Sequence, residues 1–99
     1  MKGVFKEIKF SLEMGYSRAD FLSKLSDQNK YTYQWANNVI IIDYQDEQLQ
    51  LTLGDETLRK VLSANQPILP VSFDFSKMTR AKQEQFMDIF MLKFQRGGG

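Results

Sequence analysis

The sequence predicts a single α+β domain in which a largely antiparallel sheet of four to five strands is packed by two to three helices. Three consecutive segments between residues 31 and 53 are separated by turn-forming residues, which is typical of antiparallel strands. Residues 31–35 and 48–53 alternate along the strand, whereas residues 39–44 are apolar on both faces over four positions, so we place that strand centrally in the sheet. Segments with apolar residues three and four positions apart flank them, as expected for helices on that sheet. The 99 residues suffice for one domain, which we place at residues 1–96, with a flexible glycine tail at 97–99.

The segment at residues 6–14 fits two kinds of element. Apolar residues occupy every second position from Ile8 to Met14, which indicates a strand with one solvated face. Ile8 and Leu12 are also spaced as on one side of a helix. We favour the strand because the alternation is unbroken until Gly15, but the helix stays open as an alternative.

The remaining elements follow in order along the chain. Ser17 and Asp20 resemble the start of a capping box, so a helix is expected directly after Ser17. Leu58, Val61 and Leu62 form an apolar stripe with helical spacing. The expected bounds are 18–27 for the first helix, 31–35, 39–44 and 48–53 for three strands of a meander, 56–65 for a second helix, 70–75 for a last strand and 79–95 for a final helix.

The composition removes several kinds of chemistry. The chain has no cysteine and no histidine, so it lacks thiolates, the commonest general base and the commonest metal ligand. No glycine motif for nucleotide phosphates occurs. We therefore expect a protein that is not an enzyme and uses no cofactor and no metal. Neither a secretory signal nor a long apolar run is visible, so we expect a cytoplasmic protein without a membrane partner.

The final helix carries more apolar surface than one sheet face requires. Placed at about 100° per residue, the apolar residues between 86 and 94 span roughly 200°, whereas a helix resting on one sheet needs roughly 100°. Met87, Met91 and Phe94 lie on the surplus side. Methionine suits adaptable interaction surfaces, so these three residues are candidates for a partner-binding or dimer face. The alternative is that the helix and a neighbouring helix bury all of them.

Charge is distributed unevenly although the net charge is only +1. Residues 31–58 contain no lysine or arginine but five acidic residues. Three of these, Asp43, Asp46 and Glu47, cluster at one expected turn. An acidic tip of this kind is a candidate contact for a basic protein partner. The alternative is a solvated turn whose charges are balanced within the fold.

Aromatic residues mark the first strand of the meander. Tyr31, Tyr33 and Trp35 share one face of that strand, and sheets that stack nucleic-acid bases use such aromatics. Phosphate binding also needs a basic surround, which this acidic part of the chain does not supply. Nucleic-acid binding is therefore the alternative function, and packing of the aromatics beneath a helix is the competing interpretation.

If residues 6–14 were helical, the element order would be helix, three-stranded meander, helix, strand, helix. That order resembles the small secretion chaperones of bacteria, which dimerise and bind unfolded effectors. The resemblance covers topology only and would imply a chaperone function. Taken together, the sequence favours a small protein that binds and occludes another protein, as an inhibitor, an immunity protein or a chaperone in a bacterial or phage setting.

Overall fold

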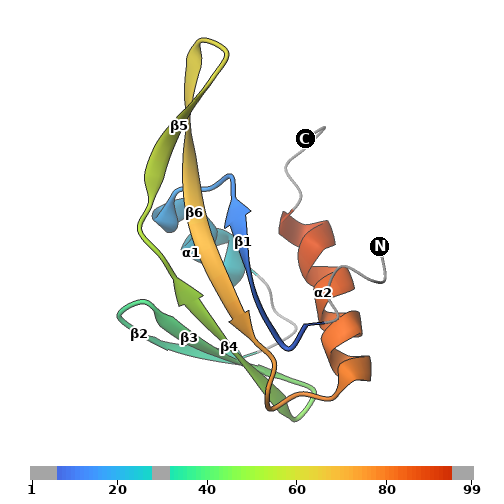
Figure 1. Cartoon of the computed structure of the whole chain (residues 1–99). Helices are drawn as coiled ribbons and strands as arrows, with labels where there is room; N and C mark the ends of the chain where they lie inside the picture. The colour runs from blue at the N-terminus through green and yellow to red at the C-terminus, as the bar shows by residue number, and fades with distance from the viewer. Residues whose placement is uncertain (1–6, 28–31, 95–99) are drawn as a thin grey trace.

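A computed structural model of the chain describes residues 7–27 and 32–94 (Figure 1). Within these ranges it confirms the α+β class and the antiparallel sheet. The strands are β1 (Lys9–Met14), β2 (Thr32–Ala36), β3 (Val39–Tyr44), β4 (Glu47–Leu53), β5 (Thr57–Val61) and β6 (Ala64–Asp74), and the helices are α1 (Arg18–Ser26) and α2 (Arg80–Phe94). The described part therefore has one strand more than the upper expectation. The expected tail at 97–99 lies outside the described residues.

The sheet has the order β1-β6-β4-β3-β2, and β5 pairs only with β6. The meander expected from short loops is confirmed, because β2 pairs with β3 and β3 with β4 in antiparallel register. The open choice at 6–14 is resolved in favour of a strand, which pairs with β6 from Lys9↔Asp74 to Met14↔Leu69. The helical order that resembled the secretion chaperones is therefore not formed.

The helix expected at 56–65 is wrong. Residues 57–61 form strand β5. A turn at Leu62 and Ser63 connects it to β6, with which it pairs in antiparallel register from Val61↔Ala64 to Thr57↔Ile68. The physical reason is the lack of a surface on which a third helix would pack, because α1 and α2 already cover the apolar face of the sheet. Leu58 and Leu62 are both exposed, so neither of these helically spaced residues packs against the core.

The core lies between one face of the sheet and the two helices. Phe73 of β6 and Phe90 of α2 have ring centroids 5.4 Å apart, and Phe21 of α1 lies 5.0 Å from Phe94 of α2. The Tyr16 hydroxyl donates to the Phe94 carbonyl at 2.7 Å, which ties the start of α1 to the end of α2. The sheet residues that face this core include Phe10, Leu12, Met14, Ile40, Ile42, Tyr44, Leu49, Leu51, Leu53, Leu69, Val71 and Phe73.

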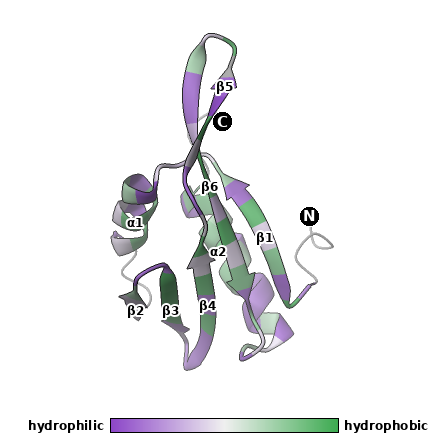
Figure 2. Ribbon diagram, turned by 60° about the vertical axis from the view of Figure 1, so that its left-hand side comes forward, coloured by the Kyte–Doolittle hydropathy of each residue, from purple (hydrophilic) through white to green (hydrophobic). Residues whose placement is uncertain are grey.

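No described helix covers the opposite face of the sheet (Figure 2), and the residues on that face are largely polar. Ser11 and Ser72, on neighbouring strands, are hydrogen-bonded at 2.8 Å. Gln48 and Thr52 on β4 are exposed there. On β3 this face carries the half-buried Ile41, so the four-residue apolar run of β3 is fully buried on one side only. A sheet with one packed and one solvated face is typical of antiparallel architecture.

Candidate protein-binding surfaces

The residues of α2 that the sequence suggested as a partner-binding face are largely buried in the core of the domain. Met87 is 1% exposed and Phe94 is 3% exposed, and both belong to the core. Met91 is half-buried and packs against that core. The surplus apolar surface is absorbed because α2 contacts both the sheet and α1. Of the apolar residues on this helix, Leu92 is the strongly exposed one, at 73%.

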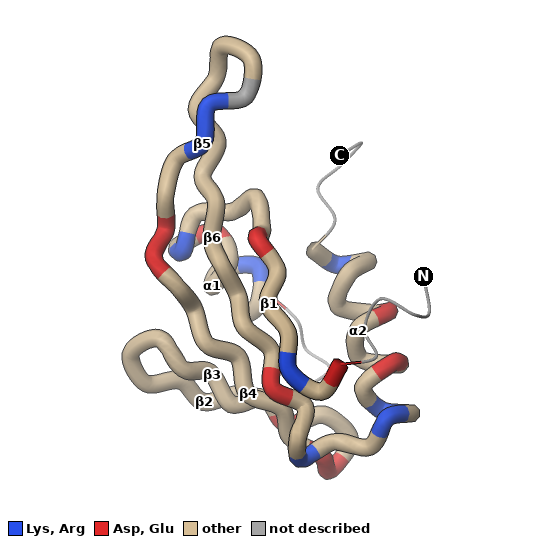
Figure 3. The backbone as a smooth tube through the Cα atoms, in the orientation of Figure 1, with Lys and Arg blue, Asp and Glu red and all other residues tan. Residues whose placement is uncertain are grey.

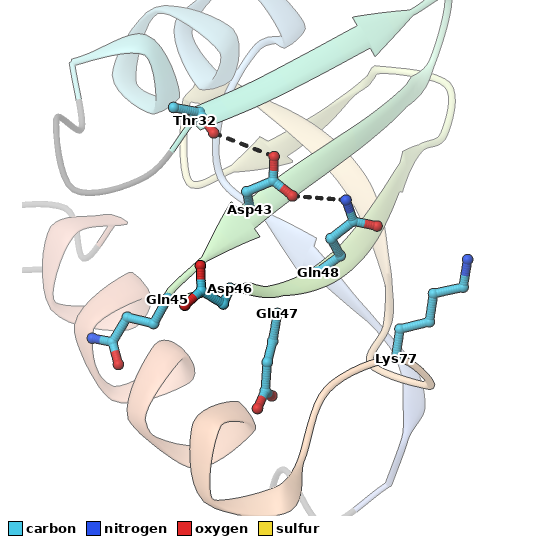
Figure 4. A pocket seen from close by; sticks show the side chains of 7 residues that line it. All are labelled: Thr32, Asp43, Gln45, Asp46, Glu47, Gln48 and Lys77. Carbon is cyan, nitrogen blue, oxygen red and sulfur yellow. Dashed lines mark hydrogen bonds between the residues drawn. The ribbon is translucent and has the colours of Figure 1, made fainter.

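The three acidic residues Asp43, Asp46 and Glu47 do cluster at the β3–β4 turn, but their carboxylates have different contacts. Together with Thr32, Gln45, Gln48 and Lys77, residues Asp43, Asp46 and Glu47 line an open hollow at the β3–β4 turn (Figure 4). Glu47 points toward the start of α2, where its Oε1 accepts from the Thr79 backbone N–H at 2.8 Å. It therefore neutralises an unpaired N–H at a positive helix end, which is a structural role.

Asp43 and Asp46 differ from Glu47 in their surroundings. Asp43 lies on the polar sheet face and accepts from Gln48 Nε2 at 2.8 Å and from Thr32 Oγ1 at 3.3 Å. Asp46 is exposed, and no hydrogen bond or ion pair joins it to another described residue. Gln45 and Asp46 both have positive φ angles, 49° and 69°, as a type I′ turn requires. No three carboxylates of the described chain converge as a metal site would require.

The pKa values of two groups are displaced by their surroundings. Burial raises the pKa of the Tyr44 phenol, whose hydroxyl donates to Gln85 Oε1 at 2.9 Å. The pKa of Asp74 is lowered, first by hydrogen bonds from the backbone and side chain of Ser76; burial opposes this lowering, and the charges of Lys9 and Lys77 add smaller contributions to it. The Ser76 N–H lies 2.9 Å from Asp74 Oδ1.

Asp74→Asn is expected to lower the free energy of unfolding at neutral pH by about 0.5–1.5 kcal/mol, the range for one hydrogen bond. Because the folded pKa lies below the ordinary 3.8, the carboxylate stabilises the fold above that value, and its contribution disappears as pH falls through the folded pKa. Urea titrations between pH 7 and pH 2 should therefore show wild type and variant converging in acid. Asp88→Asn, at an exposed carboxylate on α2, is the control; equal curves for both variants would contradict the assignment.

The aromatic strand presents one strongly exposed ring. Tyr33 is half-buried opposite Ile42, whereas Trp35, opposite Ile40, is 52% exposed. Both side chains lie on the core-facing side of the sheet, at its β2 edge. Tyr31 lies outside the described residues. The described strand thus contributes a single accessible aromatic, and packing against the core accounts for Tyr33.

A surface that the sequence did not indicate is the hairpin formed by β5 and the first half of β6, residues 57–67, here called the arm. It stands clear of the sheet and helices (Figures 1 and 2). Every described side chain from 57 to 65 is exposed. Leu58 is 66% exposed, and Leu62, at the tip, is 95% exposed with a positive φ of 57°. The helical spacing of its apolar residues concealed this hairpin.

The arm is basic and is anchored at its base. Arg59 and Lys60 lie on β5, and residues 57–67 contain no acidic residue (Figure 3). Arg59 Nη2 forms an ion pair with Glu13 Oε1 on β1 at 2.9 Å. Just before β5, Glu56 Oε1 accepts the backbone N–H of Arg18, the first residue of α1, at 2.8 Å. These contacts join the base of the arm to β1 and to the start of α1.

No protein family, curated protein or solved structure was found to match this chain. None of the helices in residues 7–27 and 32–94 is long and apolar enough to cross a membrane.

Proposed function

We propose that this protein is a non-enzymatic module that binds another protein and occludes a functional site on it, and that the arm makes the principal contact. The observation that carries the proposal is Leu62: a large apolar residue, 95% exposed, at the tip of a projecting hairpin and in a left-handed backbone conformation. The modes that fit best are those of an inhibitor or an immunity protein in a bacterial or phage setting.

In the unbound protein, the arm contains an unfavourable backbone conformation at Leu62 that no burial of its side chain offsets. A left-handed conformation is unfavourable by roughly 1–2 kcal/mol for a residue with a side chain, whereas glycine or asparagine adopts it readily. Leucine at this position therefore opposes folding of the hairpin, and its side chain gains no burial in the monomer. Burying one leucine in a partner would contribute about 1.5–3 kcal/mol. Binding is the step at which this residue becomes favourable.

The chemistry of the arm defines its partner. An apolar tip needs an apolar pocket, and the positive charges of Arg59 and Lys60 favour an acidic rim around it. Arg59 is already paired with Glu13, so within the described part of the arm the charge of Lys60 is the one available to an acidic partner. The remaining exposed large apolar residues, Ile8, Trp35 and Leu92, are not neighbours in the chain or on one element. The scattered positions of these residues favour binding by insertion of the arm, rather than binding through the broad apolar groove that a chaperone would offer.

Leu62→Asn is expected to weaken partner binding at least tenfold while leaving the fold intact or slightly more stable. The side chain that would enter the pocket is lost, but asparagine tolerates the positive φ angle. Affinity would be measured by calorimetry against the protein encoded by a neighbouring gene, or against a partner first isolated by capture and then purified. Circular dichroism and thermal unfolding would report the fold.

The matched control is Leu92→Asn, the same substitution at a leucine of comparable exposure on α2. It should leave affinity within about twofold, as surface changes outside an interface do. If Leu92→Asn weakened binding and Leu62→Asn did not, the contact would lie on α2 and the arm would be excluded.

A further inference from the structure

Within the described residues, β2 carries none of the sequence features that normally keep the edge strand of a sheet from pairing. No described strand pairs with its outer edge, since β2 ends the sheet order and contacts only β3. Its sequence, TYQWA, contains no charged residue, proline or glycine. Natural edge strands are usually protected by lysine, proline or bulges. The opposite edge strand, β1, carries Lys9 and Glu13, so the described strands at the two edges differ in the charges that would oppose pairing.

The backbone of β2 presents its free groups at two residues. Ala36 and Val39 flank a two-residue loop, and such a flanking pair exchanges both of its hydrogen bonds in a hairpin. Bonding alternates along an antiparallel pair, so Ala36, Gln34 and Thr32 bond toward β3. The N–H and C=O groups of Tyr33 and Trp35 therefore point to the outer edge.

We propose that a second copy of this chain pairs with this edge, β2 against β2 in antiparallel orientation, about a two-fold axis at Gln34. This inference does not depend on the arm. In that register Tyr33 of each copy lies opposite Trp35 of the other, and the two free groups of each meet their complements. Cross-strand aromatic pairs are among the favourable pairs in sheets. The strand reads aromatic, glutamine, aromatic around its centre, so it is complementary to itself, as a two-fold interface requires.

Charge fixes the same orientation. Near one end of β2 lies Asp43, held by Thr32, and at the other end the Arg18 guanidinium donates to the Asn37 carbonyl at 2.8 Å. Neither group forms an ion pair within the described chain, since Glu56 binds only the backbone N–H of Arg18. Antiparallel pairing places the acidic end of one copy beside the basic end of the other. Parallel pairing would place like charges together.

The predicted association is weak. Four backbone hydrogen bonds and two aromatic pairs form an interface smaller than that of typical stable complexes, so a dissociation constant on the order of 10–1,000 µM is expected. Trp35 is the only tryptophan of the chain and half exposed in the monomer. Its fluorescence should therefore shift to shorter wavelength as the concentration rises and the ring becomes covered.

The test uses opposite charges at the centre of the proposed pair. Gln34→Lys places two lysines against each other at the axis and should raise the dissociation constant about fivefold or more, as measured by sedimentation velocity and Trp35 emission. Gln34→Glu should do the same. An equimolar mixture of the two variants should associate again, at least as tightly as wild type, because lysine then faces glutamate.

The control is Gln50→Lys, the same substitution on the same sheet face but on the central strand β4. It should associate like wild type. A wild-type protein that stays monomeric with constant Trp35 emission up to about 1 mM would overturn the proposal. So would a dimer that persists unchanged in Gln34→Lys, or a mixture of Gln34→Lys and Gln34→Glu that does not recover association.

Discussion

Phe90→Ala is expected to lower the free energy of unfolding by about 3–5 kcal/mol, the range for removing a buried phenylalanine ring. Phe90 is 0% exposed. Its ring packs against rings from three elements: Phe21 of α1 at 6.4 Å, Phe73 of β6 at 5.4 Å and Phe94 of α2 at 4.3 Å. Removing it would leave a cavity where the sheet and the two helices meet.

Small domains have a total stability of about 5–15 kcal/mol, so this variant should be partly unfolded at 37 °C. Urea denaturation followed by circular dichroism would measure the loss, with the slope checked against wild type. Leu92→Ala, on the same helix and 73% exposed, should change stability by no more than about 0.5 kcal/mol. Comparable losses in both variants would mean that α2 packs on the sheet by a different face.

Met87→Lys should cost several kcal/mol and prevent stable folding. Met87 is 1% exposed within the core cluster, and an ammonium group there would be buried without a counter-charge. The measurement is thermal and urea unfolding of the purified variant.

Met91→Lys is the informative comparison. Met91 is half-buried at the border of the core, so a lysine there would extend its ammonium to solvent while its stem stays packed. A loss of no more than about 1.5 kcal/mol is expected. If Met87→Lys instead folded with wild-type stability and lost partner binding, the binding face predicted from the sequence would be restored.

The sequence was most informative where local chemistry and burial agree. β3 is found at 39–44 as predicted, because its run of β-branched residues, its flanking turns and its pairing all favour the same strand. Ser17 accepts the Asp20 backbone N–H at 3.1 Å, as the capping pattern predicted. The final helix, expected at 79–95, spans Arg80–Phe94.

The arm shows where periodicity fails. Leu58, Val61 and Leu62 have the spacing of an amphipathic helix, but that spacing is informative only if a core face is available to bury it. No local rule reveals that two other helices have filled that face. The same limit applies to α2. The width of its apolar arc follows from the sequence, but whether α1 or a partner covers the additional apolar surface depends on contacts with residues far away in the chain.

By itself, the sequence determined the α+β class, the meander and the absence of histidine and cysteine chemistry, since each follows from residue types and from contacts between near neighbours. Only the tertiary structure decided that Met87 and Phe94 are interior, that Glu47 serves α2, and that residues 57–67 project from the body. The physical reason is competition for a single apolar sheet face. Its outcome depends on how much area α1 and α2 together cover, and no segment encodes that area on its own.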